Sequence, residues 1–123
     1  MPAALHHVNL SVPEGCADSE AEWLTDMLGY RPATPGPDAA KFGTLRWFEA
    51  DDGHQVHLTV DAEHRPSARA HTAVRLDDAL DGVVARLEAG GVSPRAITFD
   101  GDRHVFTTDP AGNLWELIGP PAD

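Results

Sequence analysis

The sequence predicts an α+β protein made of two βαβββ modules that form one domain around a metal-binding cavity. Three observations predict this class: apolar residues alternate along several short segments, two longer segments show helical spacing of apolar residues, and the same order of elements occurs twice. The predicted domain spans residues 1–123, with one module at about 1–62 and the other at about 68–120. Since each module alone is too small to bury a core, we expect the two to fold together.

The first module is expected to contain a strand, a helix and three further strands. Ser19 and Glu22 predict a capping box at the start of the helix, and Gly29 ends it. The segment after Gly29 holds three prolines, so it predicts at best an edge strand followed by a loop. A hairpin turn at residues 51–53 joins the last two strands. The expected elements lie at residues 5–12, 19–28, 30–40, 44–50 and 55–60.

The second module repeats this order after a polar connector. Asp77 or Asp78 is expected to cap its helix, and Gly90 with Gly91 ends it. Residues 109–112 predict a turn before the last strand, which the glycine and prolines at 119–121 are expected to end. The strands are expected at residues 70–76, 96–99, 104–108 and 113–118.

Aligning the modules pairs residues of like type or like chemistry. The pairs are His7 with His71, Gly29 with Gly91, Gly53 with Gly112, and His57 with Glu116. The offset falls from 64 to 59 along the modules, which short loop deletions explain. The alignment therefore indicates two copies of one supersecondary unit.

Four of these aligned residues are metal-ligand types: His7, His57, His71 and Glu116. Each lies on a predicted strand and points away from its apolar face, so two curved sheets facing each other would bring the four together. Imidazole and carboxylate ligands suit Fe, Mn, Ni, Co or Zn, so we expect one divalent metal per chain. An octahedral metal would keep two positions for a substrate with adjacent oxygens. Without His57, the other three form a facial triad typical of Fe(II) or Mn(II).

Several other residues are candidates for lining the cavity. His104 is the candidate second acid or base. Polar and aromatic candidates are Asn9, Arg46, Trp47, Phe48, Thr59 and Phe106, and for the aromatic ones core packing is the alternative. His6, His54 and His64 are expected to face solvent, and Cys16 is assigned no role.

The composition excludes some classes of partner. Nine basic and 20 acidic residues give a formal net charge of -11, which argues against binding nucleic acid or an anionic membrane. One cysteine allows no intrachain disulfide and no cysteine-based zinc site. Neither a signal peptide nor a transmembrane segment is expected, so a cytoplasmic location follows by default. The preference for Arg over Lys, with many Ala, Pro and Gly, suggests a bacterial source.

Four segments carry a family resemblance, which extends over nearly the whole chain. Residues 5–12, 53–58, 71–74 and 109–117 resemble the ligand strands of the vicinal oxygen chelate superfamily, which includes glyoxalases, bleomycin-resistance proteins and extradiol dioxygenases. The Asp-Pro-x-Gly-Asn-x-x-Glu-Leu ending is the most specific part. The resemblance implies that His7, His57, His71 and Glu116 bind a metal, and that the protein is a homodimer.

The resemblance leaves the reaction open. Bacterial glyoxalase I usually has Glu at the position of His57, fosfomycin-resistance thiol transferases generally lack a ligand there, and extradiol dioxygenases use two His and one Glu. The first hypothesis is a metal-dependent enzyme, a lyase, isomerase or dioxygenase, that acts on a small chelating substrate. In the reactions that transfer a proton, Glu116 or a metal-bound hydroxide would be the base. The alternative is a metal-free protein that sequesters a drug, as bleomycin-resistance proteins do. A third possibility is a regulatory protein with a vestigial site.

Overall fold

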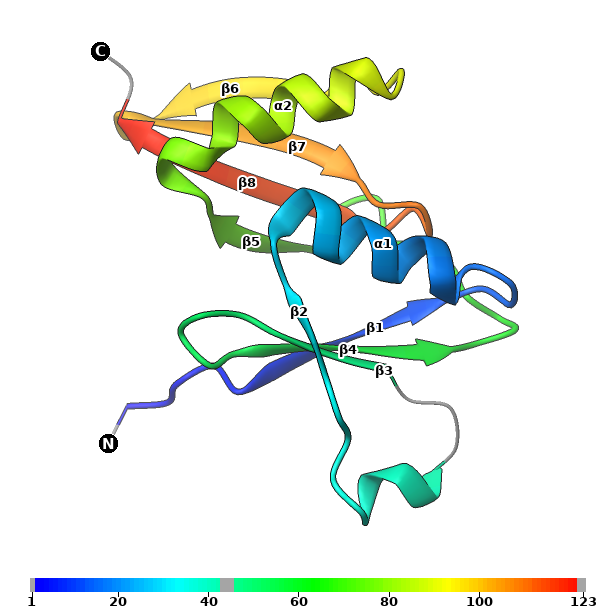
Figure 1. The fold of residues 1–123 in the computed structure, drawn as a ribbon. Coiled ribbons are helices and arrows are strands. Elements are labelled where there is room, and N and C mark those ends of the chain that lie inside the picture. Colours follow the sequence, from blue (N-terminus) through cyan, green and yellow to red (C-terminus); the bar gives the residue numbers. More distant parts are fainter. Residues whose placement is uncertain (1, 43–45, 122–123) are drawn as a thin grey trace. The chain divides into compact units, whose positions relative to one another are not determined.

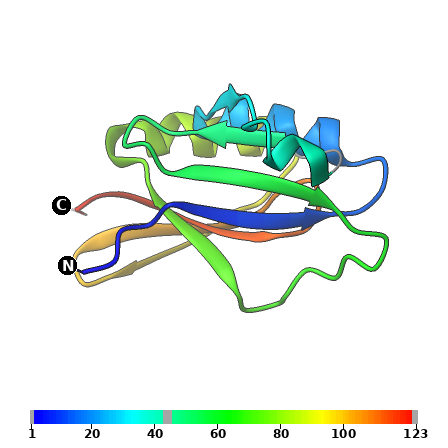
Figure 2. The ribbon, with the colours of Figure 1, turned by 90° about the horizontal axis from the view of Figure 1, so that it is seen from below.

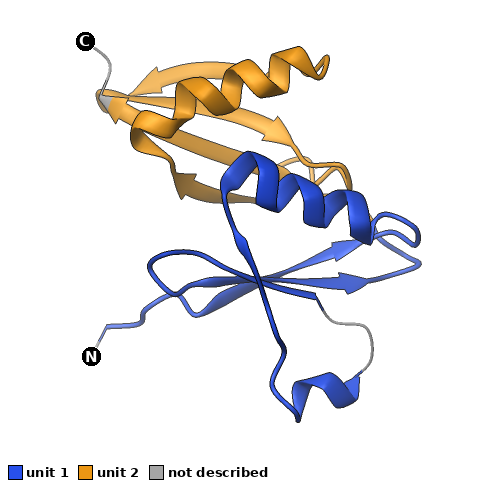
Figure 3. Cartoon of the chain, in the orientation of Figure 1, with its two compact units in different colours: residues 1–64 blue, residues 65–123 orange. Residues whose placement is uncertain are grey.

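The chain divides after His64 into unit 1, Met1–His64, and unit 2, Arg65–Asp123 (Figure 3). The structure is a computed structural model that describes residues 2–42 and 46–121. Within these residues, no helix is both long and apolar enough to cross a membrane.

Unit 1 contains one four-stranded sheet and one α-helix (Figure 1). The strands lie in the order β1-β4-β3-β2, with β1 parallel to β4 and the other neighbours antiparallel. Figure 2 shows β1 and β4 running side by side in the same direction. The elements are β1 (His7–Val12), α1 (Ala17–Leu28), β2 (Arg31–Ala33), the 3-10 helix η1 (Ala39–Phe42), β3 (Arg46–Glu49) and β4 (Gln55–Val60).

Unit 2 repeats this topology with the strand order β5-β8-β7-β6, again with its first and last strands parallel. Its elements are β5 (His71–Arg75), the 3-10 helix η2 (Asp77–Ala79), α2 (Leu80–Ala89), β6 (Arg95–Phe99), β7 (Asp102–Thr108) and β8 (Leu114–Pro121). The predicted α+β class and the two βαβββ modules are therefore confirmed.

The strand registers repeat as well, which supports the alignment made from the sequence. His7 lies opposite Gln55 in unit 1, so His57 is two residues further along the partner strand. In unit 2 His71 lies opposite Leu114, and Glu116 is again two residues further along. Side chains two residues apart on a strand share a face, so each unit brings its aligned pair together on one side of its sheet.

The core of unit 2 lies between α2 and the sheet, and in Figure 1 the helix runs across the sheet face. Leu80, Val83 and Leu87 of α2 are buried, as are Trp115 and Leu117 of β8. Gly119 of β8 allows the closest approach, because a Cβ atom there would lie 2.5 Å from Cδ2 of Leu80. This contact fixes the helix against the strand that carries Glu116.

In unit 1 the described sheet buries Phe48, Val56 and Leu58, and β1 buries Val12. Phe48 was a candidate for the cavity wall, and its burial assigns it to the core instead. The alternation of strand side chains explains this, because Phe48 follows Trp47 and must point to the opposite face.

Both predicted helix caps are wrong. Helix α1 begins at Ala17 with Cys16 as N-cap and has no side-chain cap; Ser19 lies inside the helix, and its hydroxyl donates to the Cys16 carbonyl at 3.0 Å. Asp77 and Asp78 form the separate turn η2, so α2 begins without a side-chain cap. A serine or aspartate caps a helix only from the position before its first turn, and here tertiary packing sets that position.

Strand boundaries in unit 2 also differ from prediction. Strand β8 continues to Pro121, where the sequence predicted an end, and β7 begins at Asp102 because that residue pairs with Pro121. A proline at a strand end needs no ladder hydrogen bond from its nitrogen, so it is tolerated there. In unit 1 the predicted strand at 44–50 is observed from Arg46, and residues 44 and 45 lie outside the described residues.

Candidate functional site

The best-defined polar cluster in unit 2 joins His71 of β5, Glu116 of β8 and His104 of β7. His71 Nε2 lies 2.9 Å from Glu116 Oε1, and His104 Nδ1 makes a very short contact with Glu116 Oε2. Glu116 and His104 are buried, whereas His71 remains partly exposed. Both carboxylate oxygens of Glu116 are therefore held by imidazole rings from the two neighbouring strands.

The protonation of His71 follows from its two neighbours. Its Nδ1–H donates to the backbone carbonyl of Arg69 at 2.8 Å, so Nε2 carries the lone pair when the ring is neutral. That lone pair would face the lone pairs of an ionised Glu116 oxygen across 2.9 Å. A proton or a metal ion between the two atoms removes this repulsion. The carbonyl of Arg69, and then the hydrogen bond and charge of Glu116, accordingly raise the pKa of His71.

One face of the His104 ring is covered. The ring of Phe99 stacks on it with centroids 3.8 Å apart and planes at 20°. Because His104 is only 7% exposed, it is placed to contact Glu116 and not a ligand outside the protein.

Unit 1 places His7 and His57 at the equivalent positions. Their rings stack with centroids 4.1 Å apart, and the indole of Trp47 stacks on the other face of His57 at 4.2 Å. His7 is exposed and His57 is buried. Burial, and then the positive charge that His7 and His6 can carry, lower the pKa of His57, so His57 stays neutral and able to bind a metal.

One nitrogen of His57 is already occupied. Its Nε2 lies 2.8 Å from Oε1 of Gln55, a contact in which the ring donates and the amide oxygen accepts. His57 can therefore offer Nδ1 to a metal directly, or Nε2 after Gln55 moves. His57 is thus less free than His71, whose Nε2 faces only Glu116.

The pair in unit 2 fits a metal. Two ligand atoms that bind one ion at about 2.1 Å, at an angle of about 90°, lie about 3 Å apart. The 2.9 Å between His71 Nε2 and Glu116 Oε1 matches that spacing. The hydrogen bond from Nδ1 to a backbone carbonyl is the usual support of a ligating histidine. In residues 2–42 and 46–121, no group of three or more His, Cys, Asp or Glu side chains is placed to hold a metal ion, so the four-ligand set stays a prediction.

Asp109 explains why the Asp-Pro-x-Gly-Asn segment precedes Glu116. Its buried carboxylate accepts backbone N–H groups of Ala111 at 3.0 Å and Asn113 at 2.9 Å. Its other oxygen accepts the indole N–H of Trp115 at 2.9 Å. The turn is thereby tied to the residue beside Glu116, which fixes where β8 begins and which face Glu116 occupies.

The remaining cavity candidates are only partly placed as expected. Thr59 donates to the side-chain oxygen of Asn9 at 2.9 Å across β1 and β4. Arg46 forms an ion pair with Asp18 at 2.5 Å, so its charge is already compensated. Phe106 contacts the ring of His71 edge-on at 5.6 Å. Phe106 and Trp47 therefore lie beside the proposed ligands of their own units, at matching positions opposite Glu116 and His57.

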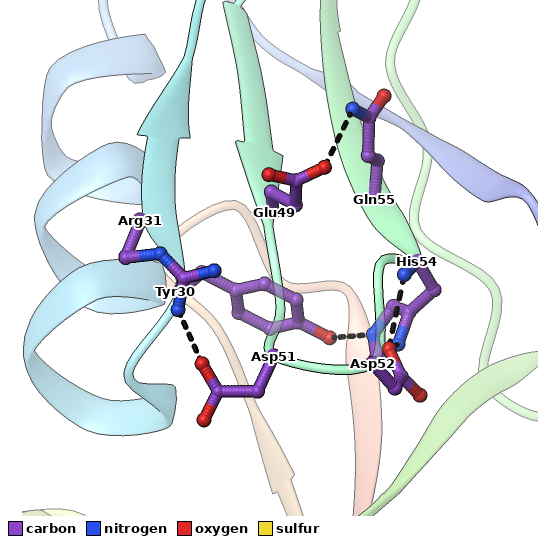
Figure 4. A network of polar contacts seen from close by, with 7 residues as sticks. All are labelled: Tyr30, Arg31, Glu49, Asp51, Asp52, His54 and Gln55. Carbon is purple, nitrogen blue, oxygen red and sulfur yellow. Dashed lines mark hydrogen bonds and ion pairs between the residues drawn. The ribbon is translucent and has the colours of Figure 1, made fainter.

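Two histidines expected to face solvent have specific partners. Ser11 Oγ and His64 Nδ1 lie 2.6 Å apart, and His64 is half-buried. His54 is also half-buried and joins a network at the β3–β4 hairpin (Figure 4). The predictions for His54 and His64 are therefore wrong, because each ring is paired by residues distant in the sequence.

In that network Tyr30 donates its hydroxyl to Nε2 of His54 at 2.8 Å, and Nδ1–H of His54 donates to Asp52 at 2.5 Å (Figure 4). Burial, and then the charge of Asp52, raise the pKa of Tyr30 to about 12. The backbone and side-chain hydrogen bonds from His54 lower the pKa of Asp52. Tyr30 is buried, so this Tyr-His-Asp chain does not present a nucleophile. It connects the β3–β4 hairpin to the segment that follows α1.

Comparisons with known proteins agree with the repeated topology. The sequence matches the profile of the Glyoxalase/Bleomycin resistance protein/Dioxygenase superfamily over residues 4–117. A search of curated proteins finds no match. Among solved structures, a glyoxalase family protein from Bacillus anthracis has a TM-score of 0.82 at 21% identity, covering 97% of this chain and 96% of that one.

Two further structures have named activities. Fosfomycin resistance protein FosX from Listeria monocytogenes has a TM-score of 0.77 at 17% identity, covering 98% of this chain and 95% of that one. Lactoylglutathione lyase from Agrobacterium tumefaciens has a TM-score of 0.69 at 22% identity, covering 96% and 94%. A FosX variant was solved with Mn(II) and a dihydroxypropylphosphonic acid. At these identities the likeness establishes the fold alone.

Proposed function

Since the chain belongs to the glyoxalase/bleomycin resistance protein/dioxygenase superfamily, we propose that it is a divalent-metal-dependent enzyme whose small substrate chelates the metal through adjacent oxygens. The observation that carries the proposal is the imidazole nitrogen of His71 facing a Glu116 oxygen at 2.9 Å, with the other ring nitrogen fixed by a backbone carbonyl. A proton shared by the two atoms satisfies this arrangement in the metal-free protein, and a divalent metal bound by both atoms would replace that proton.

The proposed ligands are His71 and Glu116 from unit 2 and His7 and His57 from unit 1, for one ion of Fe, Mn, Ni, Co or Zn per chain. The stacked rings of His7 and His57 support their inclusion, because stacking aligns two imidazole edges on one side. If His57 does not bind the metal, the set reduces to the facial triad of His7, His71 and Glu116. The metal, when bound, supplies Lewis-acid stabilisation of negative charge that develops on a substrate oxygen.

Glu116 is the proposed base. A carboxylate at this place can take a proton from a carbon next to a chelating oxygen, which is the step that lyase and isomerase reactions share. His104 acts through Glu116, because its contact with Oε2 keeps the carboxylate in one orientation while Oε1 faces His71. We further propose that this is a cytoplasmic bacterial protein that forms a homodimer. The mass of the protein in solution tests the homodimer.

Metal content tests the proposal. The protein, purified without a histidine tag or chelator, should carry about one equivalent of a transition metal per chain by elemental mass spectrometry. His7→Ala and Glu116→Ala should each lose it, whereas Glu88→Ala, which removes an exposed carboxylate of α2, should keep it. A protein that takes up none of the five ions after reconstitution would contradict the proposal and favour metal-free drug binding.

A further inference from the structure

A pocket in unit 2 lies beside His71, which forms part of its wall. Its volume is about 440 Å³, which suits a small organic molecule. It is lined by Ala68, Arg69, His71, Arg95, Phe106 and Leu114. His71 is thus shared between the proposed metal ligands and this pocket, so a molecule in the pocket would reach the metal.

Two arginines line this pocket, and neither forms an ion pair with an acidic side chain in the described part of the chain. The chain has 20 acidic and nine basic residues, so a cation that pairs with no carboxylate is unexpected. Arg69 and Arg95 form no ion pair with a carboxylate in the described part of the chain, whereas five other basic residues do. Those five are Arg31, Lys41, Arg46, Arg75 and Arg103.

The position of Arg95 is fixed by an aromatic ring. Its guanidinium lies 5.2 Å from the centroid of Phe106, and Phe106 in turn contacts His71 edge-on. A guanidinium held over a ring keeps its N–H donors free at its edge, where they match the geometry of an oxyanion. Arg69 is anchored separately, since its carbonyl accepts the Nδ1–H of His71.

A second hollow continues from the first. Its volume is about 290 Å³, and it shares Ala68, Arg95, Phe106 and Leu114 with the first. Arg95 therefore lines both hollows.

We propose that this pocket binds an oxyanion of the substrate, either a carboxylate or a phosphoryl-type group, with Arg95 and Arg69 as the specificity-determining residues. The inference rests on the proposed function, and it narrows the substrate to a small organic anion. The chelating oxygens lie at His71, and the oxyanion lies at the arginines. In a chain of charge -11, arginines without carboxylate partners give this pocket a local positive charge that would favour an anionic substrate.

Inorganic phosphate tests the pocket without a metal. We expect metal-free protein to bind phosphate in a calorimetric titration, Arg95→Gln to weaken binding at least about tenfold, and Arg69→Gln to weaken it less. Arg65→Gln should bind as the wild type does, because Arg65 is an exposed arginine of the same unit that does not line the pocket. No phosphate binding by the wild type, or equal binding by the wild type and Arg95→Gln, would overturn the inference.

The binding of two hydroxamates then distinguishes a failure of the oxyanion pocket from a failure of the proposed metal site. Acetohydroxamate chelates through two adjacent oxygens, and succinohydroxamate adds a carboxylate to the same group. Protein loaded with Mn(II) should bind succinohydroxamate at least about tenfold more tightly, and Arg95→Gln should remove that preference. Equal binding of the two by the wild type would overturn the substrate class and leave the metal site standing. Binding of neither would contradict the metal site, and the phosphate titration would still decide the oxyanion pocket.

Discussion

In both units, two residues at equivalent positions in the strand register share one face of the sheet. The two units differ in the chemistry of this pair and in the direction in which the pKa of its histidine is shifted. In unit 1 the pair is two imidazoles, and burial together with His7 lowers the pKa of His57. In unit 2 the pair is an imidazole and a carboxylate, and the pKa of His71 is raised. One backbone pattern therefore favours the neutral form of His57 in unit 1, and in unit 2 it gives a pair that holds a proton until a metal replaces it.

The turns before the last strands differ in the same way. Ala50 and Asp109 occupy equivalent positions, since each accepts the N–H of the turn glycine, Gly53 or Gly112, and each donates its own N–H across the turn. The Asp109 side chain adds a buried carboxylate with three partners, whereas Ala50 adds none. The turn of unit 1 relies instead on exposed Asp52 and on His54. Unit 2 thus fixes its ligand strand from inside its own core.

The largest expected effect comes from making the turn of unit 2 resemble that of unit 1. Asp109→Ala should lower the free energy of unfolding by about 3 kcal/mol, because the Trp115 indole N–H and two backbone N–H groups lose a charged acceptor. Urea unfolding followed by tryptophan fluorescence measures this. Asp52→Ala is the matched control and should cost less, since Asp52 is exposed. Equal losses in the two variants would mean that burial of Asp109 does not matter.

The contributions of the two ligand pairs can be compared by substituting one residue in each pair and measuring the metal affinity of the variants. Glu116→Gln should weaken Mn(II) or Zn(II) binding by at least about 100-fold, the upper end for loss of a supporting partner, whereas His57→Gln should cost about tenfold. The difference is expected because Gln55 already occupies Nε2 of His57. Competition with a chelating dye gives both constants. If His57→Gln costs as much as Glu116→Gln, the two units contribute equally and His57 is a full ligand.

Protons should compete with the metal mainly at unit 2. A raised pKa means that His71 binds its proton more tightly than a free histidine does, so metal affinity should fall as the pH drops through that pKa. In metal-free Glu116→Gln the pKa of His71 should fall, because the carboxylate that favours its charged form is gone. Histidine NMR titration measures this, and an unchanged pKa would separate His71 from Glu116.

Helix packing is compared at one position. Gly119 of β8 aligns with Val60 of β4 in the repeat; Val60 is 41% exposed, whereas Gly119 is buried against Leu80. Gly119→Ala should therefore lower the unfolding free energy by about 2 kcal/mol through overpacking. Gly36→Ala is the control, since a Cβ atom there meets nothing within 4 Å. Thermal unfolding of both variants measures the difference. An unchanged unfolding free energy in Gly119→Ala would show that Leu80 can move aside.

The smallest effect belongs to the hairpin of unit 1. Tyr30→Phe should cost about 1 kcal/mol, the value of one hydrogen bond to His54. Tyr30 is the single tyrosine, so its phenolate absorbance should titrate near its pKa of about 12. Because the folded pKa is raised, its stabilising contribution is complete below about pH 10 and is lost as the pH rises towards 12. A midpoint near 10 in folded protein would mean that Tyr30 is open to solvent.

The sequence by itself determined the repeat and the strand face of each candidate ligand. Alternation along a strand has a period of two, and turn residues punctuate it, so His7, His57, His71 and Glu116 were assigned to strand faces without any long-range information. The aspartate, proline and glycine before Glu116 were recognisable as a turn for the same local reason.

Only the tertiary structure decided which atoms meet. The contact of Glu116 with His71, the stacking of Phe99 on His104 and the pairing of His54 with Tyr30 depend on register and packing between different strands and segments. The missed helix caps have the same cause, because packing rather than propensity set where α1 and α2 begin. Local periodicity fixes the direction of a side chain, but its partner is chosen by residues that the sequence places far away and the fold brings near.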